Sequence, residues 1–215
     1  MKRTRWRIMQ SKLIRSIIFD AMFLAIIIIM TFVPYIGFIQ VGLISFTLIH
    51  IPVLIGAAIF GWKRGLMYGI FFGVASLIKA TTYPGTIDFL FVNPLISVLP
   101  RALFGLAAGF LFSLIRRMPK FYQKGIHITL ASFVLTAFHT FLVLTMLWLV
   151  YRSELESFLE TSLTWAGLAL ASLIGAGALI EAGLAAIITP TVSLLVFNKY
   201  PNLALRKDGN HETGN

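Results

Sequence analysis

Long apolar stretches separated by short polar segments run along most of this sequence. Each stretch is bounded by charged residues, proline or glycine, and they lie at about 14–32, 44–60, 65–78, 94–115, 128–151 and 168–197. A helix needs about 20 mostly apolar residues to cross the hydrocarbon core of a bilayer. The pattern therefore predicts an all-α integral membrane protein, a bundle of six transmembrane helices in which the third is short and Pro190 kinks the sixth.

Composition agrees with this pattern. Of 215 residues, 58% are hydrophobic and 12% are charged, with a mean hydropathy of +0.89, whereas a soluble domain has about 25% charged residues. The chain has no cysteine, which excludes disulfides, thiolate metal sites and cysteine nucleophiles. We expect the first apolar stretch to be a span and not a cleaved signal peptide, because it is long and no small-x-small site follows it.

The basic residues predict the orientation of the bundle. Of 18 lysines and arginines, all but Lys79, Arg101 and Arg152 lie near the two chain ends, at 63–64, or between the fourth and fifth stretches. By the positive-inside rule, both termini are then cytoplasmic, which requires an even number of spans. The net charge of +10 is explained by topology, and nucleic-acid binding is not expected. The chain thus divides into a basic tail (1–12), a membrane domain (13–200) and a polar cytoplasmic tail (201–215).

The sequence lacks the motifs of several enzyme classes. It has no G-x-x-x-x-G-K-[ST], so this chain is not expected to bind ATP through a P-loop. It has no G-x-S-x-G or H-E-x-x-H, and we predict no catalytic residue, no metal and no cofactor, since two isolated histidines (His50 and His139) are weak grounds for a haem.

Three ionisable residues lie within the apolar stretches: His50, His139 and Glu181. Ionisable groups in a bilayer are costly and are therefore functional candidates. The alternative for each histidine is a neutral ring bonded to a carbonyl of a neighbouring helix. Glu181 needs a proton or a partner, and Lys79 or Arg101 is a candidate for that partner.

Small residues recur at four-residue spacing, which places them on one helix face where another backbone can approach closely. The sets are Ala21 and Ala25; Gly65, Gly69 and Gly73; Gly105 and Gly109; and Ala178, Ala182 and Ala186. We expect most of them to pack inside this chain's own bundle, and the alternative is contact with another subunit. Segments 34–42, 80–93 and 152–165 are expected to close an outward-facing pocket with polar and aromatic walls.

Four segments together resemble a known family. They are Ala21-Met-Phe-Leu-Ala25; Phe38-Ile-Gln-Val-Gly42 followed by His50-Ile-Pro-Val-Leu-Ile-Gly-Ala57; Gly61–Lys79, ending in Ala75-Ser-Leu-Ile-Lys-Ala80; and Ile180-Glu-Ala182 through Ile187-Ile-Thr-Pro190. In this order they are similar to the substrate-binding S-components of energy-coupling factor (ECF) vitamin transporters, over roughly residues 13 to 200.

The resemblance implies a six-helix bundle in the cell membrane of a prokaryote, surrounded by lipid, that binds a vitamin in its outer half. It also implies three partners: a coupling membrane subunit and two cytoplasmic ATPases. In the family, alanines at four-residue spacing in the first helix contact the coupling subunit, and Ala21 and Ala25 fit that pattern. The competing interpretation is a non-transport integral membrane enzyme or assembly subunit.

The second and third segments look most like the pantothenate-type group, and the alternatives are pyridoxine, hydroxymethylpyrimidine or riboflavin. Pantothenate is an anion, so we expect Arg101 first, and Lys79, to bind its carboxylate; the alternative is that both only reach headgroups or pair with Asp88. A basic vitamin would use Glu181 instead. The other candidate binding residues are Asn93, Tyr83, Gln40, Trp165 and His139.

Overall fold

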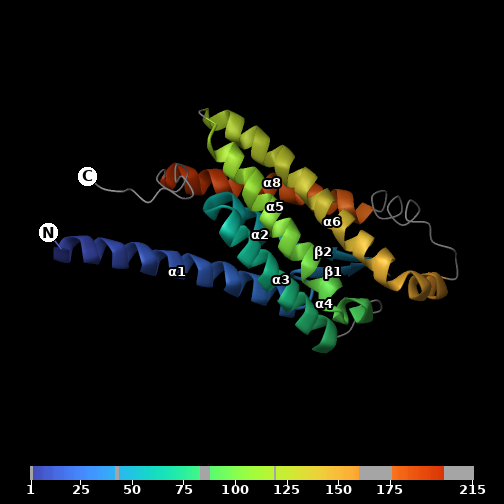
Figure 1. Cartoon of the computed structure of the whole chain (residues 1–215). Coiled ribbons are helices and arrows are strands. Elements are labelled where there is room, and N and C mark those ends of the chain that lie inside the picture. Colours follow the sequence, from blue (N-terminus) through green and yellow to red (C-terminus); the bar gives the residue numbers. More distant parts are fainter. Residues whose placement is uncertain (1, 42–43, 83–87, 119, 160–175, 201–215) are drawn as a thin grey trace.

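The computed structural model describes residues 2–41, 44–82, 88–118, 120–159 and 176–200, which form a helical bundle with a two-stranded sheet at one end (Figure 1). Its helices are α1 (Lys2–Phe32), α2 (His50–Phe60), α3 (Trp62–Thr82), α4 (Pro94–Ser97), α5 (Leu99–Arg116), α6 (Phe121–Leu159) and α8 (Ala176–Lys199), with a 3-10 helix at Asp88–Val92. Strands β1 (Phe38–Val41) and β2 (Ile44–Thr47) pair antiparallel.

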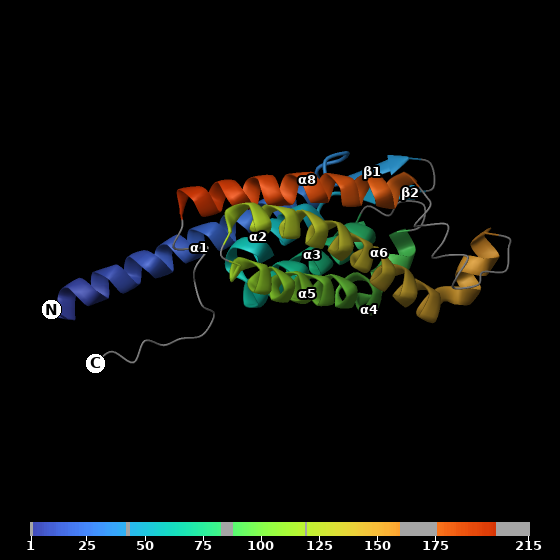
Figure 2. The ribbon, with the colours of Figure 1, turned by 90° about the horizontal axis from the view of Figure 1, so that it is seen from above.

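The two ends of the bundle differ in composition. α1 begins and α8 ends at the same end, beside the α2–α3 and α5–α6 junctions (Figures 1 and 2). We call this the basic end, because Lys63, Arg64, Arg116, Arg117 and Lys199 belong to these junctions and helix ends. The opposite end, called the sheet end, carries β1, β2 and α4. Which end faces the cytoplasm stays a prediction.

Helix α2 is the centre of the bundle. It contacts α1, α3, α5, α6 and α8, and ten of its 11 residues are buried. Gly61 ends it with a φ of 85°, a conformation that glycine adopts without strain. At 1.5 Å per residue, its length is about 16 Å, roughly half of the hydrocarbon thickness.

The sheet corrects one boundary and leaves the all-α class in place. The second span does not begin at Ile44, because Ile44–Thr47 forms β2 and the helix begins at His50. The sequence Ile-Ser-Phe-Thr alternates apolar and polar residues, as a strand does, and it pairs with Phe38–Val41. The short α2 is thus preceded, at the sheet end, by strands and not by more helix.

Other helix boundaries also differ from the sequence pattern. α3 has 21 residues and is not short, because Gly61 alone interrupts the helix and Lys63 and Arg64 already lie in its first turn. α1 is continuous from Lys2, so the expected tail at 2–12 is helical. α6 continues beyond a break at Tyr151 (φ −125°, ψ 32°); residues 152–159, expected as a loop, are therefore helical.

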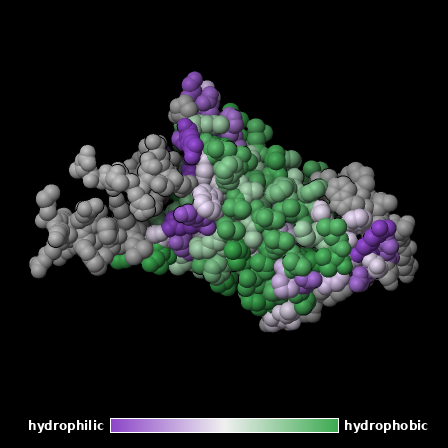
Figure 3. All heavy atoms as spheres, viewed as in Figure 1, coloured by the Kyte–Doolittle hydropathy of each residue, from purple (hydrophilic) through white to green (hydrophobic). Residues whose placement is uncertain are grey.

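Four of the described helical segments are long and apolar enough to cross a membrane: Trp62–Thr82, Pro94–Arg116, Phe121–Glu154 and Gly177–Lys199. Ser16–Phe32 and His50–Phe60 are shorter apolar helices. Large apolar side chains such as Ile187, Leu195 and Phe110 are exposed. Figure 3 shows hydrophobic residues over the middle of one face and hydrophilic residues towards its margins, the distribution that a lipid environment favours.

The interface between α3 and α5 is built from glycine. A methyl group on Gly65 would overlap the Gly105 carbonyl, and one on Gly69 would overlap the Arg101 carbonyl. At Gly73 the added carbon would lie 2.6 Å from Val98 Cα. The two backbones therefore touch directly, which confirms the expectation that these glycines pack inside the bundle and fixes the position of Arg101 relative to α3.

Candidate binding site

Three buried ionisable side chains from three helices surround one group of aromatic rings. His50 is the first residue of α2, Arg101 lies in the first turn of α5, and His139 is in α6. Their exposed fractions are 0%, 4% and 5%. We call these residues the His–Arg cluster.

Phe72 and Phe104 connect the members of the cluster. The His139 ring lies 4.9 Å from Phe104 and 5.8 Å from Phe72, and the His50 and His139 rings stack with centroids 6.1 Å apart. Phe72 also lies under the Arg101 guanidinium, with 5.6 Å from its carbon to the ring centroid. The Phe72 ring therefore contacts both the Arg101 cation and His139.

Arg101 does not reach out to headgroups, because its side chain is buried. Its Nη1 donates to the Ile96 carbonyl at 2.5 Å, and Phe91 covers the guanidinium at 5.1 Å. Among the described residues, Nε has no hydrogen-bond partner and no carboxylate forms an ion pair with Arg101. A buried guanidinium with a free donor is suited to an anionic ligand.

His50 lacks the carbonyl partner that a structural histidine would have, and His139 has one ring nitrogen without a partner among the described residues. In the described part of the chain, both ring nitrogens of His50 lack a hydrogen-bond partner, and Nε2 of His139 also lacks one. The Thr47 backbone lies near the His50 ring, but not in hydrogen-bond geometry. The cluster thus has unused hydrogen-bonding groups on all three of its side chains.

Glu181 has a different partner from the one expected. Its carboxylate is buried in α8 and accepts a hydrogen bond from the Thr47 backbone N–H. Lys79 or Arg101 had been the expected partner, but α8 packs against α6, α2 and β2, and α5 lies on the opposite side of α2 (Figure 2). Glu181 therefore ties α8 to the end of β2.

The remaining candidate residues are not gathered around the cluster. The Lys79 ammonium lies 4.6 Å from the centroid of Phe38, the first residue of β1. Asn93 caps α4 by accepting from the Leu95 N–H at 3.0 Å, a local role typical of asparagine at this position. Gln40 lies in β1 opposite Ser45. Tyr83 and Trp165 lie outside the described residues, as do the other residues of 83–87 and 160–165 in the second and third expected loops.

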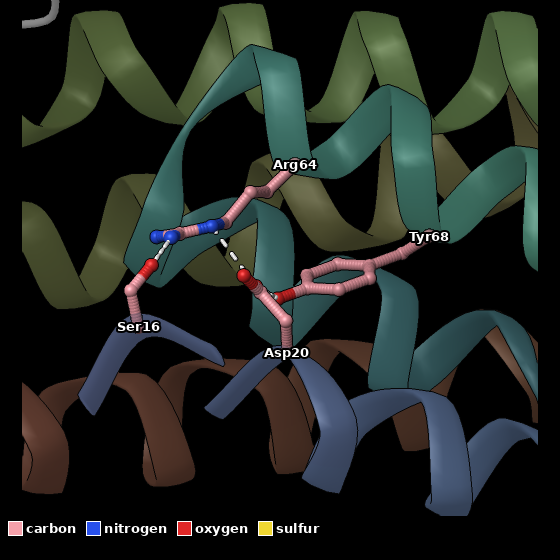
Figure 4. Close-up of polar contacts among 4 residues, drawn as sticks. All are labelled: Ser16, Asp20, Arg64 and Tyr68. Atoms are coloured by element: carbon pink, nitrogen blue, oxygen red, sulfur yellow. Dashed lines mark hydrogen bonds and ion pairs between the residues drawn. The ribbon is translucent and has the colours of Figure 1, made fainter. Parts of the chain in front are cut away.

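Helix α1 presents a different candidate surface. Ala21 and Ala25 are exposed, while Phe23, Ile27 and Thr31 face the bundle. Four side chains, called the Asp20 cluster, join α1 to α3 (Figure 4). The Asp20 carboxylate forms an ion pair with Arg64 Nε at 2.9 Å and accepts from the Tyr68 hydroxyl at 2.6 Å, and Arg64 also donates to the Ser16 hydroxyl.

Comparison with known proteins identifies the family. A family model described as "ECF transporter, substrate-specific component" matches residues 15–193. The chain belongs to this family. S-components are the substrate-specific subunits of ECF transporters and not enzymes, and the four apolar helices long enough to cross a membrane agree with a membrane protein of this family.

Two curated relatives carry the same substrate in their names. This S-component is 33% identical over 104 residues to the pantothenate transporter PanT of Leuconostoc mesenteroides, covering 46% of this chain and 51% of that protein. It is 35% identical over 117 residues to the pantothenic acid transporter PanT of Lactococcus lactis, covering 51% and 60%. The matches therefore span little more than half the length of either relative.

The fold is also that of a solved S-component. The structure of the S-component for biotin from an ECF-type ABC transporter has a TM-score of 0.58 and 18% identity, covering 85% of this chain and 92% of that one. At this identity the likeness concerns the fold alone.

His50 of this S-component was a functional candidate from its place in an apolar stretch, but it was not among the predicted binding residues. Phe72, Phe91 and Phe104 were not predicted. The sequence offers one signal for Phe72, because it lies three residues after Gly69 and seven after Gly65 and so near the helix face that meets α5. Nothing in the sequence indicates that His50 faces His139, because that contact depends on how α2 and α6 pack.

Proposed function

We propose that this S-component captures pantothenate from outside a prokaryotic cell, for uptake driven by partner subunits. In this proposal its basic end and both termini face the cytoplasm, where a coupling membrane subunit and two ATPases act with it. One observation carries the choice of ligand: Arg101 is 4% exposed and has a donor, Nε–H, without a partner among the described residues.

The physical reason is the cost of burying a charge. An unpaired ion inside a protein costs several kcal/mol, and a charged partner with good geometry recovers much of that. The guanidinium fork can hold a carboxylate through two parallel hydrogen bonds. The curated relatives named for pantothenate, whose carboxylate matches this requirement, support the same ligand.

The contact of Glu181 argues against the alternative ligands. Pyridoxine or hydroxymethylpyrimidine would need a carboxylate to bind a basic nitrogen, and Glu181 is the buried carboxylate in question. It accepts one hydrogen bond from the Thr47 N–H and lies in α8, which packs against α6, α2 and β2, so a basic ligand bound to Glu181 would leave the buried Arg101 cation without an anionic partner. An anionic ligand on Arg101 supplies that partner.

Calorimetry on the purified chain tests the proposal. Arg101→Ala should weaken pantothenate binding by about 2–5 kcal/mol, or roughly 30- to 5,000-fold. Arg101→Lys should restore only part of the affinity, because an ammonium cannot form the two-pronged contact. Arg152→Ala, which removes an exposed arginine paired with Glu156, is the matched control and should bind as the wild type does.

Two results would contradict the proposal. One is a folded Arg101→Ala variant that loses less than about threefold in affinity. The other is wild-type protein that releases pyridoxine, a pyrimidine or a flavin, and not pantothenate, when its bound small molecules are identified by mass spectrometry.

A further inference from the structure

Binding of a carboxylate by Arg101, as proposed above, leaves the stacked histidines of the His–Arg cluster without a function. Both are more than nine-tenths buried, and three of their four ring nitrogens (both of His50, and Nε2 of His139) lack a partner among the described residues. Burying a polar group without a hydrogen bond costs stability. Phenylalanine at position 50 would avoid that cost among the rings of Phe104 and its neighbours, so the histidine is unfavourable for packing alone.

The position of the pair relates it to Arg101. Phe72 lies 5.8 Å from the His139 ring and 5.6 Å from the Arg101 guanidinium, and Phe104 touches both histidines, at 4.9 Å from His139 and 6.4 Å from His50. A ligand with its anionic group on Arg101 therefore needs to extend past only one aromatic ring to reach the histidines.

The chemistry of a neutral imidazole defines what the pair can bind. Each ring has one N–H donor and one nitrogen acceptor, so two rings suit a group that both donates and accepts, such as a hydroxyl or an amide. A carboxylate only accepts and is better matched by Arg101. A metal ion is disfavoured, since the Arg101 cation is close and the described residues contain no group of three metal-ligating side chains.

We propose that His50 and His139 recognise the uncharged hydroxyl or amide part of the ligand, and that His50 determines specificity for it. This inference rests on the proposed function, in which Arg101 binds the carboxylate. Pantothenate carries its two hydroxyls and its amide at a distance from its carboxylate. Arg101 would therefore bind one end of the molecule and the two histidines the other.

The test compares three probes by calorimetry. They are pantothenate; N-(3,3-dimethylbutanoyl)-β-alanine, which lacks both hydroxyls and is called the deoxy probe; and pantothenol, which lacks the carboxylate. Wild type should prefer pantothenate to the deoxy probe on the order of 10- to 100-fold, because that probe leaves the histidines unpaired. His50→Phe should reduce this preference to within about threefold. Arg101→Ala should keep it while losing the preference for pantothenate over pantothenol.

A second variant separates recognition from folding. His50→Gln keeps a donor and an acceptor and should retain part of the preference for the hydroxyls, and the thermal midpoint of empty His50→Phe should equal or exceed that of wild type. A purely structural histidine would instead lower the midpoint and weaken all three probes equally.

The outcomes distinguish this inference from the proposed function. If wild type prefers pantothenate to the deoxy probe and folded His50→Phe keeps that preference unchanged, the inference is wrong and the proposed function stands. If wild type binds pantothenate but not more tightly than the deoxy probe, the inference is also wrong. If wild type does not bind pantothenate at all, the proposed ligand is wrong and this inference fails with it.

Discussion

Small residues four positions apart occur in both α3 and α1, and the structure uses them in opposite ways. The glycines of α3 are covered by the α5 backbone so closely that a methyl group on Gly65 or Gly69 would overlap a carbonyl of α5. Ala21 and Ala25 of α1 are exposed. The spacing therefore predicts a helix face that a backbone can approach closely, but it does not say whether that backbone belongs to the same chain.

The two helices also differ in how they are attached. α3 packs against α1, α2, α4 and α5, whereas α1 contributes a narrow buried stripe of Phe23, Ile27 and Thr31 together with the Asp20 cluster. Most of its other described side chains are exposed. The α3–α5 interface thus fixes the binding site, while α1 lies at the periphery with one small-residue face open, as the proposed contact with a coupling subunit requires.

The largest effect is expected at the α3–α5 interface. Gly105→Val should prevent folding, because its Cβ would overlap the Gly65 carbonyl and backbone cannot move aside as a side chain can; we expect a loss of at least about 3 kcal/mol. The yield of monodisperse protein and its thermal midpoint measure this.

Gly183→Val is the matched control for that variant. It makes the same change within a helix, so the helix-propensity cost is equal, but nothing lies within 4 Å of the added carbon. A Gly105→Val variant as stable as Gly183→Val would show that the two backbones are not in contact.

The second prediction concerns the open face of α1. Ala25→Trp should reduce copurification of the coupling subunit at least about tenfold, because an indole keeps a partner backbone from approaching, and it should leave pantothenate affinity unchanged. Leu195→Trp, at an exposed position of α8, should leave assembly intact. Loss of ligand binding together with assembly would mean instead that Ala25 packs within the chain.

How far the fold follows from sequence depends on whether the deciding signal is local. The stretch predicted at 94–115 matches α4 and α5 (Pro94–Arg116), because proline favours a helix start and the arginine pair marks its end. β2 was missed because Ile44–Thr47 is apolar enough to extend a span. Its alternation of apolar and polar residues is too short to tell a strand from the start of a helix, and its pairing with Phe38–Val41 is a contact between two segments that no local pattern specifies.

The site shows the same limit. His139 was predicted from the cost of placing an ionisable group in an apolar segment, and Arg101 from the match between its guanidinium and a carboxylate ligand. Their convergence on Phe72 depends on the glycine contact between α3 and α5 and on the packing of α6, which no short motif encodes. Glu181 was expected to meet a cation and instead meets a backbone amide, a partner that every residue except proline can supply.

The smallest predicted effect tests how α1 is attached. Asp20→Asn should weaken the contacts to Arg64 and Tyr68 (Figure 4), costing about 1 kcal/mol because the ion pair is partly exposed. The loss should appear as roughly fivefold faster hydrogen exchange in α1, with exchange in α5 and pantothenate affinity unchanged. Tyr68→Phe removes one hydrogen bond while keeping the ion pair, so it should have the weaker effect. Equal acceleration in α1 and α5 would mean that the Asp20 cluster supports the whole bundle, and the contrast between a fixed core and a peripheral α1 would no longer hold.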